Sequence, residues 1–317
     1  MNSRFAAPVS FTTHSAVPAL PAGGVIGVIA PAGPSEFDLH SATRWMETRG
    51  YQLKVFPGVW EKDGYLAGSD AVRLRDLHDA FADDTVDAIL CMRGGYGCTR
   101  FLEHIDFELL RRHPKPFVGY SDITALHLAI TRYAGFVTFH GAMLNADLLG
   151  NKQPPTESSL LRMLSGKQPA LLEHPAAYPL TTLAPGSASG RLLGGNLSMI
   201  CATIGTAFEL DDQGIILFIE DVNEPLYRVD RLLTHLRQAG KLGRVRAVLV
   251  GDFAGVDVSR LELLLKQELG PLNIPVLAGW RSGHCDPNIT LPMGAHVRLD
   301  ADKQQLMLEQ AVVTAQT

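Results

Sequence analysis

The first half of the sequence alternates short apolar segments with segments of helical periodicity, and this alternation restricts the possible folds more than any other feature. The apolar segments 25–31, 52–57 and 88–92 are short and mostly end next to Gly or Pro, which is typical of buried strands. Between them, the spacing of apolar residues predicts helices over 38–49 and 70–81. Because strands separated by helices form parallel sheets, we expect a doubly wound, mainly parallel α/β domain.

A Pro-rich segment divides the chain. Six prolines interrupt the periodicity between residues 151 and 189, where only 156–164 keeps helical spacing. The expected organisation is a flexible leader over 1–22, an N-terminal α/β domain over 23–150, a connecting segment over 151–189 and a smaller C-terminal α/β domain over 190–317. The elements expected in the last domain are helices over 197–204, 226–239 and 259–268, strands at 214–220, 245–250 and 275–278, and a closing hairpin over 295–308.

Composition and charge exclude several classes of protein. The 317 residues are 46% hydrophobic, and the formal net charge of -5 provides no basic surface for nucleic acid. No apolar run reaches the roughly 20 residues of a membrane helix, and prolines and polar residues interrupt 1–22, where a signal peptide needs a continuous apolar stretch. We therefore expect a cytoplasmic protein without nucleic-acid or membrane partners. Four cysteines lack Cys-x-x-Cys spacing and are expected to be reduced structural thiols: Cys91, Cys98, Cys201 and Cys285.

Ser121 stands where an apolar strand turns directly into a helix. The strand is predicted over 116–119, and Ile123, Leu126 and Ile130 have helical spacing. Such a corner projects a side chain away from the backbone and directs the free N–H groups of the helix start toward a ligand. Ser121 can therefore serve as a nucleophile, as the serine of the α/β-hydrolase elbow does. It can also be a simple helix cap, because Ser is a preferred N-cap residue.

A glycine-rich turn, Arg93-Gly94-Gly95-Tyr96-Gly97, directly follows the strand predicted over 88–92. Three glycines in four positions let the backbone approach a ligand closely. The turn could cradle a phosphate, form the wall of an oxyanion hole or be only a tight turn. It has neither the Gly-x-Gly-x-x-Gly spacing of dinucleotide-binding folds nor the Lys-Ser/Thr of a P-loop, so the phosphate interpretation is weak.

Two acids and two histidines are further candidates for catalysis, because they lie at the end of a predicted strand or in a loop. Glu220 and Asp221 end a predicted strand, where they could form a metal pair, orient a histidine or cap the helix that follows Pro225. His284 lies in a Gly-flanked loop, where it is freer to meet a ligand than a histidine on a helix. His140, in Phe-His-Gly, has a comparable setting. A serine, an acid and a loop histidine in this chain order fit a nucleophile, an orienting carboxylate and a general base.

Five motifs together resemble those of the LD-carboxypeptidases, a family of cytoplasmic serine peptidases. In chain order they are Arg93-Gly94-Gly95-Tyr96-Gly97, Gly119-Tyr120-Ser121-Asp122, Gly194-Gly195-Asn196-Leu197, Glu220-Asp221-Val222-Asn223-Glu224 and Gly283-His284. They follow the order of the family across residues 24–310. The resemblance favours Ser121 as a nucleophile over Ser121 as a cap.

The resemblance implies Ser121 as the nucleophile, His284 as the general base and Glu220 as the acid that orients it, in a site between the two domains. It implies hydrolysis of the amide bond between the L-centre of a diamino acid and the terminal D-Ala of a murein tetrapeptide. It also implies a homodimer that needs no metal or other cofactor. In such a mechanism, backbone N–H groups would hold the oxyanion: that of Asp122 and that of Gly94 or Gly95.

Three residues near the motifs are candidates for substrate binding: Arg93, Tyr96 and Asn223. The sequence departs from the family at Ala142, where Pro is expected after His140-Gly141, and in the length of its leader. Neither departure touches the three residues of the expected triad.

Two other functions fit the sequence. The microcin-immunity peptidases, which share the fold, cleave acyl-sulfamoyl or aminoacyl nucleotide conjugates and need an aromatic slot for a nucleobase. Trp280 could supply that slot, although we expect Trp60 and Trp280 to lie in the core. A non-catalytic muropeptide-binding protein would keep the fold without the reaction, but an intact triad argues against it.

Overall fold

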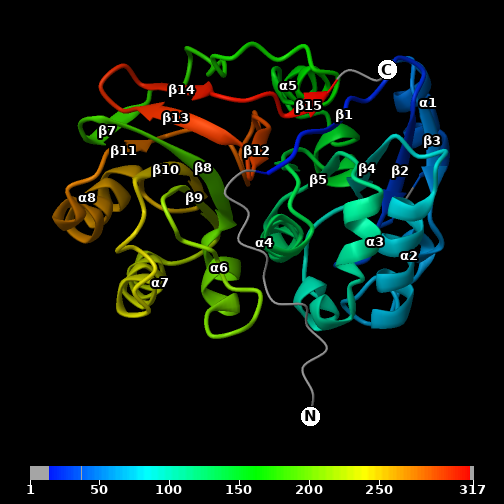
Figure 1. Ribbon diagram of the computed structural model, residues 1–317, viewed down its shortest axis with the longest axis horizontal. Coiled ribbons are helices and arrows are strands. Elements are labelled where there is room, and N and C mark those ends of the chain that lie inside the picture. Colours follow the sequence, from blue (N-terminus) through cyan, green and yellow to red (C-terminus); the bar gives the residue numbers. More distant parts are fainter. Residues whose placement is uncertain (1–13, 37, 315–317) are drawn as a thin grey trace.

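The computed structural model describes residues 14–36 and 38–314 and contains two α/β units that lie side by side (Figure 1). Within these residues the strands form a six-stranded sheet, a seven-stranded sheet and a short two-stranded pair. Over the same residues, we find no helix with both the length and the apolar character needed to span a bilayer. The predicted architecture, a mainly parallel N-terminal unit followed by a second α/β unit, is confirmed.

The N-terminal sheet has the strand order β12-β6-β5-β4-β2-β3. Its strands are β2 (Val25–Ile29), β3 (Gln52–Val55), β4 (Ala88–Cys91), β5 (Phe117–Gly119), β6 (Thr138–His140) and β12 (Leu291–Met293). Strands β2 to β6 are parallel to one another, and the edge strand β12 is antiparallel to its neighbour, β6. The chain adds β3 on one side of β2 and β4 to β6 on the other, so the carboxyl ends of β2 and β4 border the crevice in which such sheets bind ligands.

The helices of this half are α1 (Leu39–Glu47), α2 (Asp70–Ala82), α3 (Phe107–Arg112) and α4 (Thr124–Tyr133). Capping side chains fix where several of them begin. Asp38 accepts a hydrogen bond from the N–H of His40, and Ser69 accepts one from the N–H of Val72. Such caps satisfy backbone donors that have no partner within the helix. Helix α4 packs against β6 of its own sheet and against β8 and α6 of the other half.

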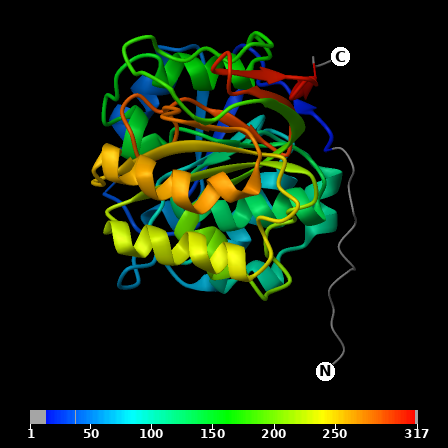
Figure 2. The same cartoon turned by 90° about the vertical axis from the view of Figure 1, so that its left-hand side faces the viewer.

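The C-terminal sheet has the order β14-β13-β8-β9-β10-β11-β7. Its strands are β7 (Thr181–Ala184), β8 (Ser187–Asn196), β9 (Ile215–Val222), β10 (Ala247–Ala254), β11 (Val276–Ala278), β13 (His296–Asp300) and β14 (Gln305–Leu308). Strands β8 to β11 are parallel, and β13 and β14 form the predicted hairpin. The helices of this half are α6 (Leu197–Thr203), α7 (Leu226–Gln238) and α8 (Val258–Leu269). Figure 2 shows α7 and α8 in contact with each other and running across this half.

Short elements complete the chain. They are β1 (Val17–Pro18), β15 (Val313–Thr314), α5 (Thr156–Leu164), the π-helix η5 (Leu144–Leu148), and the 3-10 turns η1 (Pro57–Trp60), η2 (Cys98–Arg100), η3 (Leu102–His104), η4 (Ser121–Ile123) and η6 (Gly270–Leu272). Strand β1 pairs in parallel with β15, so the two ends of the described chain meet.

Several predictions differ from the structure. Residues 1–13 of the predicted leader lie outside the described residues, but Val17 and Leu20 are buried, so the prediction of a flexible leader does not hold for 14–22. The Pro-rich segment 151–189 contributes β7 and the start of β8 to the C-terminal sheet. Trp280 is fully buried as predicted, whereas the prediction for Trp60 is wrong, because 55% of it is exposed. All four cysteines are buried and free.

Candidate active site

A cavity of about 330 Å³ lies at the carboxyl ends of the parallel strands of the N-terminal sheet, where the second half meets them. Ser35 lines it after β2, Arg93 after β4, Ser121 after β5 and Asn145 after β6. His284, from the loop after β11, closes it from the C-terminal half. The cavity thus occupies the position that the sheet topology favours for a ligand, between the two units.

Ser121 is held in a strained conformation at the start of η4. Its φ of +67° lies in the left-handed region, which few residues other than Gly, Asn and Asp adopt. The corner predicted from the sequence is therefore sharper than a normal strand-to-helix turn. The side chain does not cap the helix, because its Oγ lies 3.1 Å from Nε2 of His284. Strain of this kind is typical of functional positions, where surrounding structure enforces it.

His284 lies between Ser121 and Glu220. Its Nδ1 is 2.7 Å from Oε2 of Glu220, and its backbone N–H donates to the same oxygen over 3.2 Å. Because a carboxylate only accepts, Nδ1 carries the hydrogen and Nε2 of the neutral ring can accept the Ser121 hydroxyl proton. Glu220 itself, near the end of β9, is fully buried. The structure thus brings together the three residues that the sequence predicts as nucleophile, base and orienting acid.

Burial and the contact between the two side chains act in opposite directions on this pair. Burial alone would raise the pKa of Glu220, but the imidazoles of His140 and His284 hold that pKa below its usual value. Burial alone would lower the pKa of His284, but the hydrogen bond and charge of Glu220 raise that pKa above its usual value. The pair therefore favours an ionised carboxylate and an imidazole that readily accepts a proton.

The glycine-rich turn packs directly against the serine. A Cβ on Gly94 would lie 2.8 Å from Cβ of Ser121, and Gly95 has a φ of +127°. The buried side chain of Asp122 accepts a hydrogen bond from the N–H of Cys98 over 2.8 Å, which ties the turn to the residue after the serine. The proposed oxyanion-hole residues therefore border the cavity beside Ser121, apart from Asp122, whose side chain is turned into the protein.

The motif Gly194-Gly195-Asn196-Leu197 forms part of the contact between the two halves. A Cβ on Gly195, whose φ is +136°, would lie only 2.5 Å from Oγ1 of Thr124 at the start of α4. The Thr124 hydroxyl accepts a hydrogen bond from the N–H of Asn196 over 3.0 Å. The motif therefore lets the C-terminal sheet approach the helix that follows Ser121.

The acid next to Glu220 has a structural role. Both oxygens of Asp221 are engaged, one with the amide of Asn196 at 3.0 Å and the other with the N–H and hydroxyl of Ser198 at 2.9 and 2.8 Å. Of the alternatives that the sequence left open, the structure shows one acid on a histidine and the other directed elsewhere. The position of Gly283 has no room for a side chain, because a Cβ there would lie 2.4 Å from Oε2 of Glu220.

Of the three substrate-binding candidates, Arg93 lines the cavity, whereas the other two do not. Within the described residues, the guanidinium of Arg93 donates to the backbone carbonyls of Pro34 and Gly94, both at 3.3 Å. Tyr96 and Asn223 are absent from the lining residues of this cavity. Tyr96 is 46% exposed, and its ring meets that of Tyr65 edge-on at 5.6 Å.

A polar network that the sequence did not indicate supports the cavity wall. The Tyr120 hydroxyl donates to Oδ1 of the buried Asp147 over 3.1 Å, and Lys152 lies 2.6 Å from the same oxygen. Lys152 also donates to the carbonyl of Cys285 over 2.8 Å, so it connects this network to the His284 loop. Asp147 lies in η5 and Lys152 near the start of the connecting segment, and neither position has a periodic signal in the sequence.

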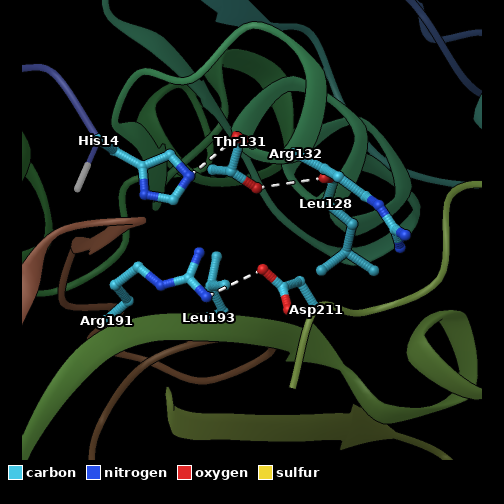
Figure 3. A pocket seen from close by; sticks show the side chains of 7 residues that line it. All are labelled: His14, Leu128, Thr131, Arg132, Arg191, Leu193 and Asp211. Atoms are coloured by element: carbon cyan, nitrogen blue, oxygen red, sulfur yellow. Dashed lines mark hydrogen bonds and ion pairs between the residues drawn. The ribbon is translucent and has the colours of Figure 1, made fainter. Parts of the chain in front are cut away.

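A second cavity lies between His14, α4 and β8 (Figure 3). On one side His14 Nε2 is 2.8 Å from the carbonyl of Thr131, and on the opposite side Arg191 donates to Asp211 over 2.9 Å. Its volume of about 10 Å³ has room for a water-sized molecule only, so it is a packing defect rather than a ligand site.

The comparison with known families agrees with the geometry of the site. The model of the LD-carboxypeptidase N-terminal domain matches residues 26–141, and that of the LD-carboxypeptidase C-terminal domain matches residues 189–299. The chain belongs to the LD-carboxypeptidase family. The resemblance noted from the five motifs is therefore confirmed.

The similarity of this LD-carboxypeptidase family member to its relatives extends over nearly the whole chain. A probable murein peptide carboxypeptidase of Bacillus subtilis is 43% identical over 302 residues, which cover 93% of this chain and 94% of the relative. The murein tetrapeptide carboxypeptidase of Pseudomonas aeruginosa is 30% identical over 299 residues, with 89% and 95% covered.

Two solved structures have the same fold as this LD-carboxypeptidase family member. An MccF-like protein from Bacillus anthracis has a TM-score of 0.86 at 26% identity, with 92% of this chain and 98% of that chain covered. A muramoyltetrapeptide carboxypeptidase from Oxalobacter formigenes has a TM-score of 0.75 at 28% identity, with 90% and 97% covered.

Proposed function

We propose that this protein is a serine carboxypeptidase that releases the terminal D-Ala of murein tetrapeptides. Ser121 is the nucleophile, His284 the general base and Glu220 the acid that orients His284. The observation that carries the proposal is the continuous contact from Ser121 Oγ through the imidazole to the buried carboxylate, at 3.1 and 2.7 Å. The names of the relatives from Bacillus subtilis and Pseudomonas aeruginosa support the substrate class.

The chemistry proceeds in two halves. His284 Nε2 takes the hydroxyl proton while Ser121 Oγ attacks the amide carbonyl carbon, and the imidazolium then gives that proton to the departing amine of D-Ala. Glu220 keeps the imidazole in the required tautomer and stabilises the imidazolium. Water, activated by the same imidazole, then hydrolyses the ester on Ser121 and frees the shortened peptide.

Backbone N–H groups stabilise the negative charge that develops on the carbonyl oxygen. The donors are the N–H of Asp122, at the start of the helical segment, and that of Gly94 or Gly95, in the turn packed against Ser121. Each donor of this kind contributes about 3–4 kcal/mol to the transition state. The strained serine and the glycine turn both lie at the cavity wall, and this position supports the assignment of the donors.

Arg93 receives the free carboxylate of the terminal D-Ala. Arg93 carries a guanidinium at the cavity wall, and among the described residues this group contacts neutral carbonyls rather than an acid. A guanidinium matches the bidentate geometry of a carboxylate. Tyr96 and Asn223 lie near the motifs but not among the residues that line the cavity, so we assign no substrate contact to them. The enzyme acts in the cytoplasm as a homodimer, as its likeness to the family suggests.

The direct test is to incubate the protein with murein tetrapeptide and to measure released D-Ala by mass spectrometry. Release by the wild type and none by Ser121→Ala or His284→Ala would support the assignment. Equal release by the wild type and His284→Ala would overturn the choice of the base. Absence of release, together with fluorophosphonate labelling of Ser121, would leave a serine hydrolase with another substrate.

The resemblance to the microcin-immunity peptidases leaves one alternative substrate, an aminoacyl or peptidyl nucleotide conjugate, and the shared fold of the MccF-like protein from Bacillus anthracis, with its TM-score of 0.86, keeps this alternative open. Trp280 does not support this alternative, because it is fully buried and has no face for a nucleobase. A competition assay between murein tetrapeptide and such a conjugate separates the two substrates. Preference for the conjugate would overturn the murein assignment.

A further inference from the structure

The second oxygen of the Glu220 carboxylate has no donor among the described residues. Oε2 receives both the ring and the backbone N–H of His284, whereas Oε1 is buried without a hydrogen bond. A buried carboxylate oxygen without a donor is costly, because it has lost the hydrogen bonds of water. A neighbouring group that can supply a hydrogen to Oε1 would therefore stabilise the ionised acid.

His140 is the group that faces this oxygen. It ends β6, is fully buried, and its Nε2 lies 3.9 Å from Oε1 of Glu220. Neither of its ring nitrogens has a hydrogen-bond partner within the described residues. The separation is too short to hold a bridging water and about 1 Å longer than a hydrogen bond, so a small rotation of the ring closes it.

The two polar rings in contact with His140, those of Tyr120 and His127, are already engaged. The Tyr120 ring lies 5.8 Å from that of His140, and its hydroxyl donates to Asp147. The His127 ring lies 6.2 Å away, and its two nitrogens contact the Thr138 hydroxyl at 2.9 Å and the Gly119 carbonyl at 2.8 Å. Phe218, at 5.0 Å, is apolar. Within the described residues, none of these three rings is positioned to donate to Oε1, whereas Nε2 of His140 faces it.

We propose that His140 is a positioning residue whose Nε2–H donates to Oε1 of Glu220, so that the carboxylate is held between two imidazoles. This inference rests on the proposed function, because it concerns how the acid keeps His284 in place. A carboxylate fixed through both oxygens cannot rotate away from Nδ1 of His284. His140 itself stays behind Glu220 and takes no proton from the substrate.

Removal of His140 changes the pH dependence in a defined direction. Without the second donor, Glu220 becomes more basic and holds the proton of His284 more tightly, so the pKa of the coupled pair rises. Because the neutral imidazole is the base, the acid limb of the rate profile moves to higher pH. The other charged groups that act on His284 are Lys152, Asp221 and Asp252, and they remain in every variant.

Three substitutions separate this role from simple packing. His140→Leu fills the space without a donor, His140→Gln places an amide N–H near the position of Nε2, and His140→Asn places one near Nδ1. We expect His140→Leu to lower kcat about 10-fold and to move the acid limb up by about one pH unit, since a hydrogen bond to a charged group is of this strength. His140→Gln should restore both values, and His140→Asn should restore neither.

The rate of Ser121 labelling by a fluorophosphonate is measured over the same pH range as D-Ala release. Labelling needs the base and the acid but no murein peptide, so a shift seen in labelling supports the inference even if the substrate is another compound. An acid limb that stays in place in His140→Leu would overturn the inference, whatever the loss of rate.

A measurement on the wild type keeps the inference testable if His140→Leu does not fold. Nitrogen chemical shifts and couplings from ¹⁵N-histidine NMR report which ring nitrogen carries the hydrogen. We expect His140 to be protonated at Nε2. A His140 ring protonated only at Nδ1 would overturn the inference.

Discussion

Ser121 comes from the N-terminal half and is placed by its backbone, whereas Glu220 and His284 come from the C-terminal half and are placed by side-chain contacts. The serine has a φ of +67°, and neither of its partners is among the described residues with positive φ. The partners are instead fixed by hydrogen bonds to each other and by the packing of Gly283 against the carboxylate.

The difference shows that the position of the nucleophile depends on its own backbone, whereas the position of the base depends on contacts with other segments. A left-handed corner leaves the serine little freedom, because the surrounding structure enforces its main-chain geometry. The base depends on contacts that cross between segments: Lys152 donates to the Cys285 carbonyl, and Thr156 accepts from the N–H of Asn288 over 2.9 Å. Substitutions among the contacts that hold the His284 loop, such as those of Lys152 and Thr156, should therefore tune the reaction, whereas loss of Ser121 or His284 itself should abolish it.

The largest effect should come from removing either member of the pair that crosses the two halves. Ser121→Ala and His284→Ala should each reduce D-Ala release about 10,000-fold, and the double variant should lose no more than a single one, because the two groups act as a unit. Turnover of the three variants checks this. Losses that multiply in the double variant would mean that the two halves contribute independently.

Arg93 tests whether the N-terminal half also recognises the end of the substrate. Arg93→Met should lower kcat/KM about 100-fold for a tetrapeptide with a free carboxylate, since a charged hydrogen-bonded pair is lost. A substrate that ends in an amide serves as the control, and the wild type and Arg93→Met should cleave it at equal, slow rates. A similar loss on both substrates would show that Arg93 supports the turn rather than the carboxylate.

The contact between the halves should be sensitive at Gly195. Gly195→Ala places a methyl group 2.5 Å from Thr124 Oγ1 at a φ of +136°, and it should lower the free energy of unfolding by about 2 kcal/mol. Gly205→Ala is a matched control, because its φ of +81° is also left-handed but no atom lies within 4 Å. It should cost about 1 kcal/mol. Equal losses in thermal unfolding would place the effect in the backbone alone.

The smallest effect concerns the strain at the corner itself. Ser121→Gly should abolish activity and raise the free energy of unfolding by about 1 kcal/mol relative to Ser121→Ala, because glycine adopts a φ of +67° without steric cost. Thermal unfolding of the two inactive variants provides the comparison. A Ser121→Gly variant no more stable than Ser121→Ala would show that the corner carries no strain.

The parallel core of both halves could be predicted because its strands are apolar and separated by periodic helices. The elements that escaped prediction lack that signal. Strand β8 contains Gly190, Gly194 and Gly195, which resemble a turn in sequence but serve close packing in the sheet. Strands β7 and β12 are short, and the first follows a run of prolines while the second contains Pro292. Tertiary pairing, rather than local propensity, makes them strands.

The site shows a similar division. Ser121 could be located from its strand-to-helix corner. Glu220 and His284 are candidates because of their settings at a strand end and in a Gly-flanked loop, and the resemblance to a family then favours them over the alternatives. The contacts of His140, Asp147 and Lys152 could not be read from the sequence, because they join segments far apart in the chain. The burial of an isolated polar side chain such as His140 or Asp147, unlike that of an apolar run, has no signature in a single sequence.

Strand β12 has a mechanical consequence. Its residues pair with β6 of the N-terminal sheet, and the chain then passes through Gly294 and Ala295 directly into β13 of the C-terminal sheet. The two units are thus joined by strand pairing a few residues after His284. A rotation of one unit away from the other would break main-chain hydrogen bonds of the N-terminal sheet. We therefore expect peptides to enter through the mouth of a rigid crevice, with no opening and closing of the enzyme during turnover.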